Sequence, residues 1–538
     1  MGVYLNPGAG MLQQGRRSQI YVDKSAMLAY LNAQVGTEQK YVCVSRPRRF
    51  GKSMAANMVC AYYDRTVDTA AEFAGLAIAG DPSFSEYAGR YDVIRVNMQE
   101  FLSATHEVER MLARLQRFVG MDIEDAYPDL RLRDPDDLAQ VMSDACAQTG
   151  RQFVVVIDEW DCPMREMQDR HDDQRRYLDF LRFWLKDRTY VALCYMTGIL
   201  PIKKYGTHSA LNMFSEFSMT GAYEMAPYVG FTEAEVRSLC GQWGRDFGLC
   251  QAWYDGYRLL GPLPKGAHAD AERPAYETYA PRSVVRAMET GVFDSYWSHT
   301  ETYDALRRYI DMDMGGLHER VVELVAGGRV RVNVGSYVND MTTFSSADDV
   351  LTLLVHLGYL GYDAATREVF VPNREVMGEF ALSVERSDGW GEVARSIRDS
   401  EGLLDALLAG DAKAVADGVE RAHEDAASVL TYNDENSLAC TLRLALHTAT
   451  RRWRLVREAP AGKGFADLVM APLASHPEVP GVVVELKYGA TPEDALAQIR
   501  ERGYARAFGE PAPAAGVLLC GIAYDPKAKE HSALIERA

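Results

Sequence analysis

Short apolar runs separated by amphipathic stretches dominate the first 225 residues of the chain. Three of these runs are almost continuously apolar, which is typical of strands covered on both faces of a parallel sheet. Helical patterns such as EVERMLARLQRFVG and DDLAQVMSDACAQ fall between them. The predicted strands are 41–45, 92–98, 153–158 and 190–198. This alternation predicts a doubly wound α/β domain.

The pattern changes twice further along the chain. The stretch FTEAEVRSLC contains Thr232 and Glu235 at the spacing of a capping box, which predicts the start of a helix. Several helices and a helix-plus-hairpin pattern at 349–375 follow. Beyond about Leu455, the order of strands and helices again predicts an α/β domain, with shorter spacing than in the first. The expected regions are 1–225, 226–385 and 386–538.

Composition narrows the class of protein. A chain of 538 residues is too long for one hydrophobic core, and 47% apolar with 25% charged residues is ordinary for a globular protein. No apolar run approaches the roughly 18 residues of a membrane helix, and the first residues lack the layout of a signal peptide. Nine cysteines without a CxxC or Cys/His cluster argue against disulfides and a structural zinc site. We therefore expect a cytoplasmic protein without a membrane partner.

The first motif with chemical content lies where the strand at 41–45 ends and a helix begins. Gly51, Lys52 and Ser53 match the end of GxxxxGK[ST], although Arg46 stands where the first glycine is expected. Backbone N–H groups at a helix N-terminus favour an anionic phosphate. Lys52 can reach the β- and γ-phosphates, and the Ser53 hydroxyl can ligate Mg²⁺. An ordinary exposed basic turn is the alternative interpretation.

A second motif favours the nucleotide site. The run FVVVIDEWD ends with Asp158, which can support Mg²⁺, and Glu159, which can polarise the attacking water. The neighbouring strand ends at Thr197, either a γ-phosphate sensor or a plain β-branched residue. The arginines of the loop can clamp phosphates, contact a partner subunit or simply be solvated. The expected nucleotide-binding residues are Arg46, Pro47, Arg48, Arg49, Phe50, Gly51, Lys52, Ser53, Asp158 and Thr197.

The last region carries a second acidic pattern. Asp467 lies in FADLVMAP, and Glu485 and Lys487 lie in VVVELKYG. Residues two apart on a strand point the same way, so Glu485 and Lys487 converge. Two carboxylates can hold Mg²⁺, and Lys487 can orient the attacking water or stabilise the oxyanion. A solvated strand edge with a Glu–Lys pair is the alternative.

Six segments resemble the family called AAA-ATPase-like proteins with a C-terminal PD-(D/E)XK nuclease domain. They are YVDKS at 21–25, SRPRRFGKS at 45–53, VIDEWD at 156–161, WYDGYR at 253–258, HLGYL at 356–360 and VPNRE at 371–375. The resemblance covers nearly the whole chain, and an arginine-rich loop replacing the first glycine is that family's own habit. It implies a P-loop ATPase domain, a helical middle region with a winged-helix-like module, and a small restriction-endonuclease-like α/β domain.

The resemblance also implies roles for single residues. It places Tyr21 and Asp23 near the nucleotide base, and Gln498 and Tyr504 beside the nuclease metal site. An acidic residue is expected on the first helix of the nuclease domain, and Glu435 is the candidate. A helix-start carboxylate favoured by the macrodipole would explain Glu435 equally well.

Charge around the second pattern agrees with a polyanion nearby. The chain has a formal net charge of -18, which excludes a generally basic nucleic-acid coat but not a locally basic channel. Six cationic residues and one acidic residue lie between Ser437 and Phe465. The interpretation is a basic patch beside the carboxylates, with a charged helix face as the alternative. The family's GR.D pattern is altered here to GFAD, which lacks the arginine but keeps Asp467.

We therefore expect an ATP-binding, ATP-hydrolysing protein coupled to a Mg²⁺-dependent nuclease acting on DNA. The alternative is an NTP-gated switch whose nuclease-like domain is a non-catalytic platform. A homo-oligomer is compatible, because many P-loop enzymes complete their sites between subunits. The expected catalytic residues are Glu159, Glu435, Asp467, Glu485, Lys487 and Gln498. The expected metal ligands are Ser53, Asp158, Asp467 and Glu485.

Overall fold

A computed structural model describes residues 2–538 except for several short segments. The exceptions are 203–210, 269–270, 298–301, 313, 339–340, 387–389, 427–440, 462–463, 474–475, 505–507 and 509–511. The chain forms two compact units. The first comprises Met1–Asp294 and Arg331–Pro372, and the second comprises Ser295–Val330 and Asn373–Ala538. The three-part division at residues 225 and 385 stays a prediction, since these units divide the middle region between them.

A five-stranded parallel sheet forms the centre of the first unit, in the order β2-β3-β4-β1-β5. Its strands are β1 (Tyr41–Ser45), β2 (Asp92–Asn97), β3 (Phe153–Asp158), β4 (Val191–Gly198) and β5 (Ser215–Phe217). All residues of β1, β3 and β4 are buried, as near-continuous apolar runs predict. The four predicted strands are therefore present, and the short β5 was missed.

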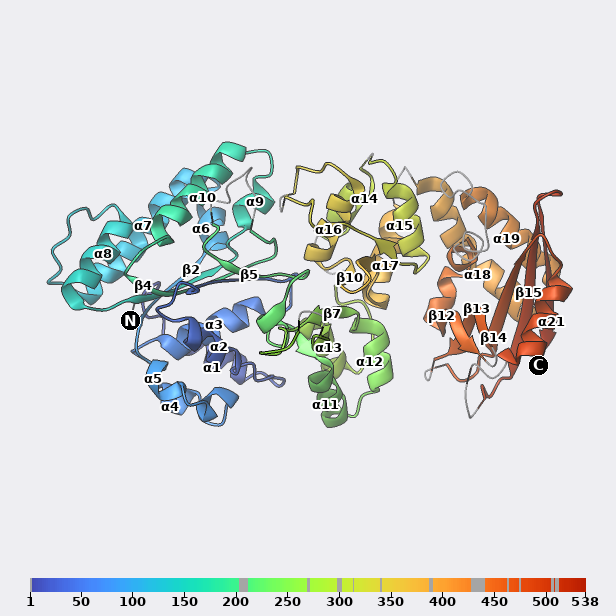
Figure 1. Ribbon diagram of the computed structural model, residues 1–538, viewed down its shortest axis with the longest axis horizontal. Coiled ribbons are helices and arrows are strands. Elements are labelled where there is room, and N and C mark those ends of the chain that lie inside the picture. Colours follow the sequence, from blue (N-terminus) through green and yellow to red (C-terminus); the bar gives the residue numbers. More distant parts are fainter. Residues whose placement is uncertain are drawn as a thin grey trace. The chain divides into compact units, whose positions relative to one another are not determined.

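Helices cover both faces of this sheet, as a doubly wound domain requires (Figure 1). Those on one side are α1 (Gly10–Arg16), α2 (Met27–Gln34), α3 (Lys52–Tyr63), α4 (Thr69–Glu72) and α5 (Phe84–Tyr87). Those on the other are α6 (Met98–Thr105), α7 (Val108–Ala126), α8 (Leu138–Thr149), α9 (Cys162–Glu166) and α10 (His171–Leu185). The α/β architecture predicted from the alternating pattern is confirmed.

The middle region contains more strand than the sequence indicated. A small antiparallel sheet of order β6-β8-β7 joins β6 (Phe231–Thr232), β7 (Tyr257–Leu260) and β8 (Ala275–Tyr279). The helices around it are α11 (Glu233–Trp243), α12 (Phe247–Tyr254) and α13 (Pro281–Thr290). The expected capping box at the start of α11 is present, and Thr232 N donates to Glu235 over 2.7 Å.

A helix and a hairpin follow as the sequence predicts. They are α16 (Ala347–Leu357), β10 (Gly361–Asp363) and β11 (Glu368–Phe370). The winged-helix-like assignment of this module stays a prediction. The remaining helices of the middle region are α14 (Thr302–Ile310), α15 (Leu317–Val325) and α17 (Arg374–Glu385). The short strand β9 (Val330–Arg331) extends the hairpin to a sheet of order β10-β11-β9.

A mixed five-stranded sheet of order β12-β13-β14-β15-β16 forms the second unit, with only the β14–β15 pair parallel. Its elements are α18 (Gly391–Ala409), α19 (Ala412–Ala426), β12 (Trp453–Ala461), β13 (Gly464–Pro472), β14 (Gly481–Tyr488), α21 (Pro492–Arg502), β15 (Val517–Asp525) and β16 (Glu530–Arg537). The small C-terminal α/β domain is therefore present. The two edge strands β12 and β16 were missed.

Each face of this sheet has its own core. Alternate residues of β14, such as Val484 and Leu486, pack in one core with residues of α18 and α19. Val483 packs on the other face with Leu496 of α21. Strand alternation thus assigns Glu485 to the α21 face. Among the described residues, no helix combines the length and apolar character needed to cross a membrane.

Candidate functional site

The loop between β1 and α3 has the backbone of a phosphate-binding turn. Gly51 precedes the first helical residue with a φ of 90°, a left-handed conformation that glycine adopts without strain. The α3 N-terminus therefore begins directly at Lys52, with backbone N–H groups at the carboxyl edge of the sheet. Ligands of open parallel sheets bind at this edge.

The Lys52 ammonium lies over the loop that precedes it. Its Nζ donates to the carbonyl oxygens of Arg46 and Pro47, at 3.0 and 2.9 Å, and the residue is only 5% exposed. Burial lowers the pKa of Lys52, and the charges of Glu159 and Asp161 oppose this change. An anion binding here would restore the stability of the charged form, since charge-assisted hydrogen bonds are stronger than those to neutral carbonyls.

Arg46 lies elsewhere than the sequence prediction placed it. The guanidinium is fully buried and donates to the carbonyl oxygens of Ser45 and Phe217, both at 2.9 Å. Burial lowers the pKa of Arg46 to about 10. Arg46 therefore fastens the loop to the end of β5, whereas Arg48 and Arg49 line the open cavity beside the loop. Because an arginine stands where the glycine is expected, its long side chain can donate hydrogen bonds to backbone carbonyls that would otherwise be unsatisfied.

The acidic residues follow the neighbouring strands. Strand β4 pairs with both β1 and β3, so Thr197 lies between the loop and Asp158. The Thr197 hydroxyl lies 3.4 Å from Asp158 Oδ1, which also accepts from the backbone N–H of Glu159 at 3.1 Å. Asp158 Oδ2 is buried and has no hydrogen-bond partner among the described residues. A buried carboxylate oxygen without a partner is costly unless a cation satisfies it.

Glu159 lies at the turn after β3, with a left-handed φ of 54°. Arg165 donates to Glu159 at 2.5 Å and to Asp161 at 3.1 Å. Asp161 Oδ2 also accepts the backbone N–H groups of Ile199 and Leu200, at 3.0 and 2.8 Å. Burial raises the pKa of Glu159, while the Arg165 and Lys52 charges lower it. A carboxylate is thus held at the cavity by an ion pair.

Lys52, Ser53, Glu159 and Arg165 line one cavity of about 940 Å³, whereas Asp158 and Thr197 are not among its lining residues. Its described lining includes Lys52, Ser53 and Glu159, together with apolar side chains such as Ile20 and Met54. Six basic and three acidic side chains are among the described lining residues. The basic ones are Lys24, Arg48, Arg49, Lys52, Arg165 and Arg282, and the acidic ones are Glu159, Glu166 and Glu289. The balance of charge favours an anion.

Several lining residues were missed by sequence reasoning. Arg282, in the first turn of α13, is exposed and lines the cavity although more than 200 residues separate it from Lys52. Asn97 ends β2 and caps α6 with its side-chain oxygen. Asparagine and proline are common at helix starts, but nothing in the sequence placed these helices at the cavity.

The YVDKS segment contributes in two ways. Tyr21 lines the cavity, as expected from the resemblance. Asp23 instead accepts the backbone N–H groups of Ser25 and Ala77, at 2.8 and 2.7 Å, and so orders the segment. Residues of the WYDGYR motif serve in packing. Tyr254 and Tyr257 are buried, and the ring centroids of Tyr257 and Phe50 of the loop lie 5.3 Å apart.

The second acidic pattern assembles on β13, β14 and α21. Lys487 Nζ lies 3.1 Å from Glu485 Oε1, as their spacing predicts. Gln498 of α21 donates to the same oxygen. Asp467 accepts the backbone N–H of Leu486 at 2.7 Å, which holds its carboxylate against β14. The structure therefore brings together four of the residues predicted for this site.

The electrostatics of Glu485 differ from those of an ordinary surface carboxylate. The residue is 1% exposed, and its Oε2 has no hydrogen-bond partner within the described part of the chain. Burial, with the nearby charge of Asp467, raises the pKa of Glu485 to about 7, and Lys487 opposes the shift. Two carboxylates close together in a low-dielectric site favour either a shared proton or a cation.

Other predicted residues fall outside this cluster. Glu435 and Lys463 lie outside the described residues, so their part in the site stays a prediction. Tyr504 is buried in the α21 core, where its hydroxyl accepts from Arg502 at 3.0 Å. In the basic stretch between Ser437 and Phe465, Arg443 donates to the Gly327 carbonyl at 3.1 Å, so its guanidinium is hydrogen-bonded within the protein.

Comparisons with known proteins place the first part of the chain. Residues 13–207 match the family described as predicted AAA-ATPase, so this segment is AAA-ATPase-like. A curated relative, the uncharacterized protein in the vnfD 5' region of Azotobacter chroococcum mcd 1, is 26% identical over 300 residues. That match covers 52% of this chain and 51% of the relative, so the chain spans about half the length of the curated relative it matches.

Two solved structures are also similar. One is the ORC1 protein of Aeropyrum pernix in complex with DNA, with 12% identity, a TM-score of 0.24, and coverage of 73% of this chain and 99% of that one. The other is Cdc6p of Pyrobaculum aerophilum, with 10% identity, a TM-score of 0.23, and coverage of 68% and 96%.

Proposed function

We propose that the first unit binds ATP at the carboxyl edge of its parallel sheet and hydrolyses it. One observation carries this proposal: Lys52, Ser53 and Glu159 line a single cavity of about 940 Å³ in which basic side chains outnumber acidic ones. Arg48 and Arg49 are available to the outer phosphates, and the apolar wall near Tyr21 suits a base. The AAA-ATPase-like match over residues 13–207 supports the same assignment.

The residues also fit a magnesium ion. The Ser53 hydroxyl and Asp158 would hold it, and the partnerless buried Oδ2 of Asp158 supports this, since a hard cation prefers carboxylate oxygens. When bound, Mg²⁺ would offset the charge that develops on the phosphates. Lys52 then contributes a fixed positive charge on the phosphates, and Thr197 orients Asp158 through its hydroxyl.

Glu159 is the proposed proton acceptor for the attacking water. In this structure its carboxylate is paired with Arg165, so accepting a proton requires that this contact loosen. When the contact between Arg165 and Glu159 loosens, Asp161 still holds Arg165, so the guanidinium stays inside the cavity. Burial makes the carboxylate a stronger base than it would be in water, because it raises the pKa of Glu159.

Nucleotide binding and steady-state hydrolysis by the full chain test this function. Lys52→Ala should abolish measurable ATP binding, whereas Glu159→Gln should keep binding and lower turnover by about 10²–10⁴-fold. Arg176→Ala, which changes an exposed arginine of α10, is the matched control and should behave as wild type. ATP binding that survives Lys52→Ala unchanged would contradict the site.

For the second unit, the function best supported is Mg²⁺-dependent cleavage of DNA. Asp467 and Glu485 would hold the ion, and the partnerless Oε2 of Glu485 fits that role. When bound, the ion activates water and offsets phosphate charge. Lys487, 3.1 Å from Glu485, would orient the water, and Gln498 would fix the Glu485 carboxylate. The restriction-endonuclease-like fold, DNA as substrate, the homo-oligomer and the cytoplasmic location remain predictions.

Plasmid nicking separates a nuclease from the alternative, an NTP-gated binding platform. The full chain with Mg²⁺ should convert supercoiled plasmid to nicked circles, and Glu485→Gln and Lys487→Ala should each lower the rate by at least about 100-fold. Glu493→Gln, an exposed acid at the start of α21, is the matched control. Absent nicking, or nicking that both substitutions leave intact, would favour the platform.

A further inference from the structure

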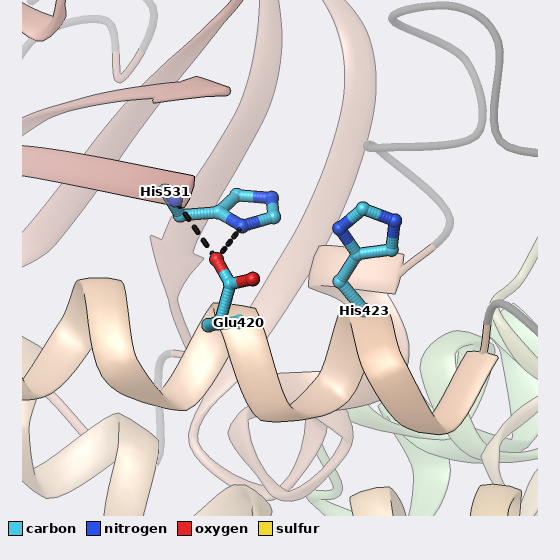
Figure 2. A group of neighbouring side chains, drawn as sticks. All are labelled: Glu420, His423 and His531. Atoms are coloured by element: carbon cyan, nitrogen blue, oxygen red, sulfur yellow. Dashed lines mark hydrogen bonds and ion pairs between the residues drawn. The ribbon is translucent and has the colours of Figure 1, made fainter. Parts of the chain in front are cut away.

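A cluster outside both proposed sites contains two histidines and a glutamate. Glu420 and His423 are three residues apart on α19, so they project from the same face of the helix. His531 approaches them from β16, as Figure 2 shows. The three side chains offer ligand atoms that all lie within 4.8 Å of one another.

The contacts within the cluster are close. Glu420 Oε2 lies 2.5 Å from His531 Nδ1 and accepts the His531 backbone N–H at 2.8 Å. The rings of His423 and His531 lie 5.0 Å apart between centroids, nearly perpendicular to each other. The His531 side chain is fully buried, and 30% of the Glu420 side chain is exposed. Of these side chains, that of His531 is enclosed, whereas that of Glu420 is partly open to solvent.

This cluster is separate from the carboxylates of β13 and β14. His531 is paired with Tyr524 across the β15–β16 ladder, and Tyr524 packs in the core shared with α18 and α19. Opposite residues of a ladder share a face, so His531 lies on the α19 face. Glu485 lies on the opposite face, where it contacts Gln498 of α21.

We infer that Glu420, His423 and His531 bind a divalent transition-metal ion of the Zn²⁺ type. Bonds of about 2.0–2.2 Å from zinc to nitrogen and oxygen place its ligand atoms about 3–4 Å apart. The observed spacing therefore needs only small side-chain adjustments, the largest being a lengthening of the Glu420–His531 contact. Two imidazoles and one carboxylate suit Zn²⁺, and water would complete a four-coordinate site from the partly exposed side of Glu420.

The protonation of the histidines is compatible with this role. Burial lowers the pKa of His423 to about 4 and also lowers that of His531, and Glu420 opposes both shifts. Metal binding requires the neutral imidazole, and both shifts favour that form. The ion would join α19 to the edge strand β16 and so stabilise the end of the sheet.

Sequence reasoning argued against a structural zinc site because it found no Cys/His cluster. The two ligands on α19 and the one on β16 are 108 residues or more apart, and a search for closely spaced ligands does not join them. Only the packing of α19 on β16 brings them together.

Zinc binding by the full-length chain tests the inference. The background should carry Glu485→Gln, so that the carboxylate pair does not contribute, and should be stripped of metal with a chelator that is then removed. Zinc is then added in competition with a chromophoric chelator. We expect this chain to bind one more Zn²⁺ tightly than its His423→Ala and His531→Ala derivatives. His476→Ala, an exposed histidine of the same unit, is the matched control and should bind zinc like the background.

A second readout guards against misfolded variants. Glu420→Gln preserves the shape of the side chain and removes its charge, so the chain should fold without metal and bind Zn²⁺ at least about tenfold more weakly. Zinc should raise the thermal midpoint of the background and the His476→Ala chain, but not that of Glu420→Gln. Equal zinc affinity in all these chains, or an equal rise with Mg²⁺ in place of Zn²⁺, would overturn the inference.

Discussion

Glu159 and Glu485 both lie beside a cation, yet their surroundings differ, since 25% of the Glu159 side chain is exposed whereas Glu485 is buried. Glu159 lies 2.5 Å from Arg165 in a cavity rich in basic side chains, and the charges of Arg165 and Lys52 oppose the rise in its pKa that burial causes. Glu485 has Lys487 at 3.1 Å, but the charge of Asp467 and burial raise its pKa to about 7. The first site attracts an anion, and the second attracts a cation.

Their construction differs as well. The anion site centres on one continuous loop, whose backbone turns at Gly51 and starts a helix at Lys52. The cation site needs the register of two strands and one contact from α21, given by Gln498. A loop of contiguous residues keeps its chemistry when its neighbours shift slightly, whereas an assembly of three elements depends on each of them.

The largest effect is expected from removing the Arg165 guanidinium of the first site. Arg165→Met leaves Glu159 and Asp161 as uncompensated, largely buried carboxylates, which should lower the free energy of unfolding by about 3–5 kcal/mol. Urea unfolding followed by tryptophan fluorescence measures this change. Arg176→Met is the control, because its pair with Glu109 is exposed on both sides and is worth less than about 1 kcal/mol. Equal losses in both variants would contradict the comparison.

The second effect concerns pH and the cation site. The pKa of Glu485 rises from 4.5 to about 7 on folding, so the native state holds a proton that the unfolded chain has already lost between these values. Stability therefore falls as pH rises through this window. In chelator, Glu485→Gln should match wild type near pH 5 and be more stable by on the order of 2 kcal/mol near pH 8, after allowance for screening.

Urea midpoints of both chains from pH 4.5 to 8.5 measure that difference. A constant gap between wild type and Glu485→Gln across this range would show that Glu485 ionises freely in the folded chain. Lys487→Met should move the window to higher pH, because it removes the charge that stabilises the carboxylate.

A smaller effect is expected at the rim of the anion site. Arg282→Ala should weaken ATP binding about tenfold, the value of one charge-assisted hydrogen bond to phosphate. Arg286 lies one turn further along α13 and pairs with Glu289 at 2.9 Å, so Arg286→Ala is the matched control with little expected change. Isothermal titration with ATP measures both, and equal affinities would remove Arg282 from the site.

The smallest effect tests how the cation site depends on α21. The Thr491 hydroxyl accepts the Asp494 backbone N–H at 3.2 Å and completes a capping box. Thr491→Ala should destabilise the second unit by about 1 kcal/mol and increase hydrogen exchange in the helix that carries Gln498. Thr491→Ser keeps the hydroxyl and should exchange like wild type. Unchanged exchange in Thr491→Ala would show that packing alone positions α21.

Residues near one another in the sequence were predictable because their geometry is local. The apolar runs fixed β1, β3 and β4, since strands covered on both faces tolerate few polar positions. Strand alternation likewise predicted the meeting of Glu485 and Lys487. Edge strands such as β5 and β16 escaped notice, because their exposed and half-buried positions dilute the apolar pattern.

The sequence by itself determined the turn at Gly51 and Lys52, the inner strands of both α/β regions, and the pairing of Glu485 with Lys487. Tertiary structure alone decided that Arg46 bonds to buried carbonyls, that Arg282 reaches the cavity, and that His531 meets α19. Periodicity reveals which face of an element is apolar, but it does not say which distant element covers that face. Side chains more than 100 residues apart meet only when the elements that carry them pack together, and the packing of the whole unit decides which elements do so.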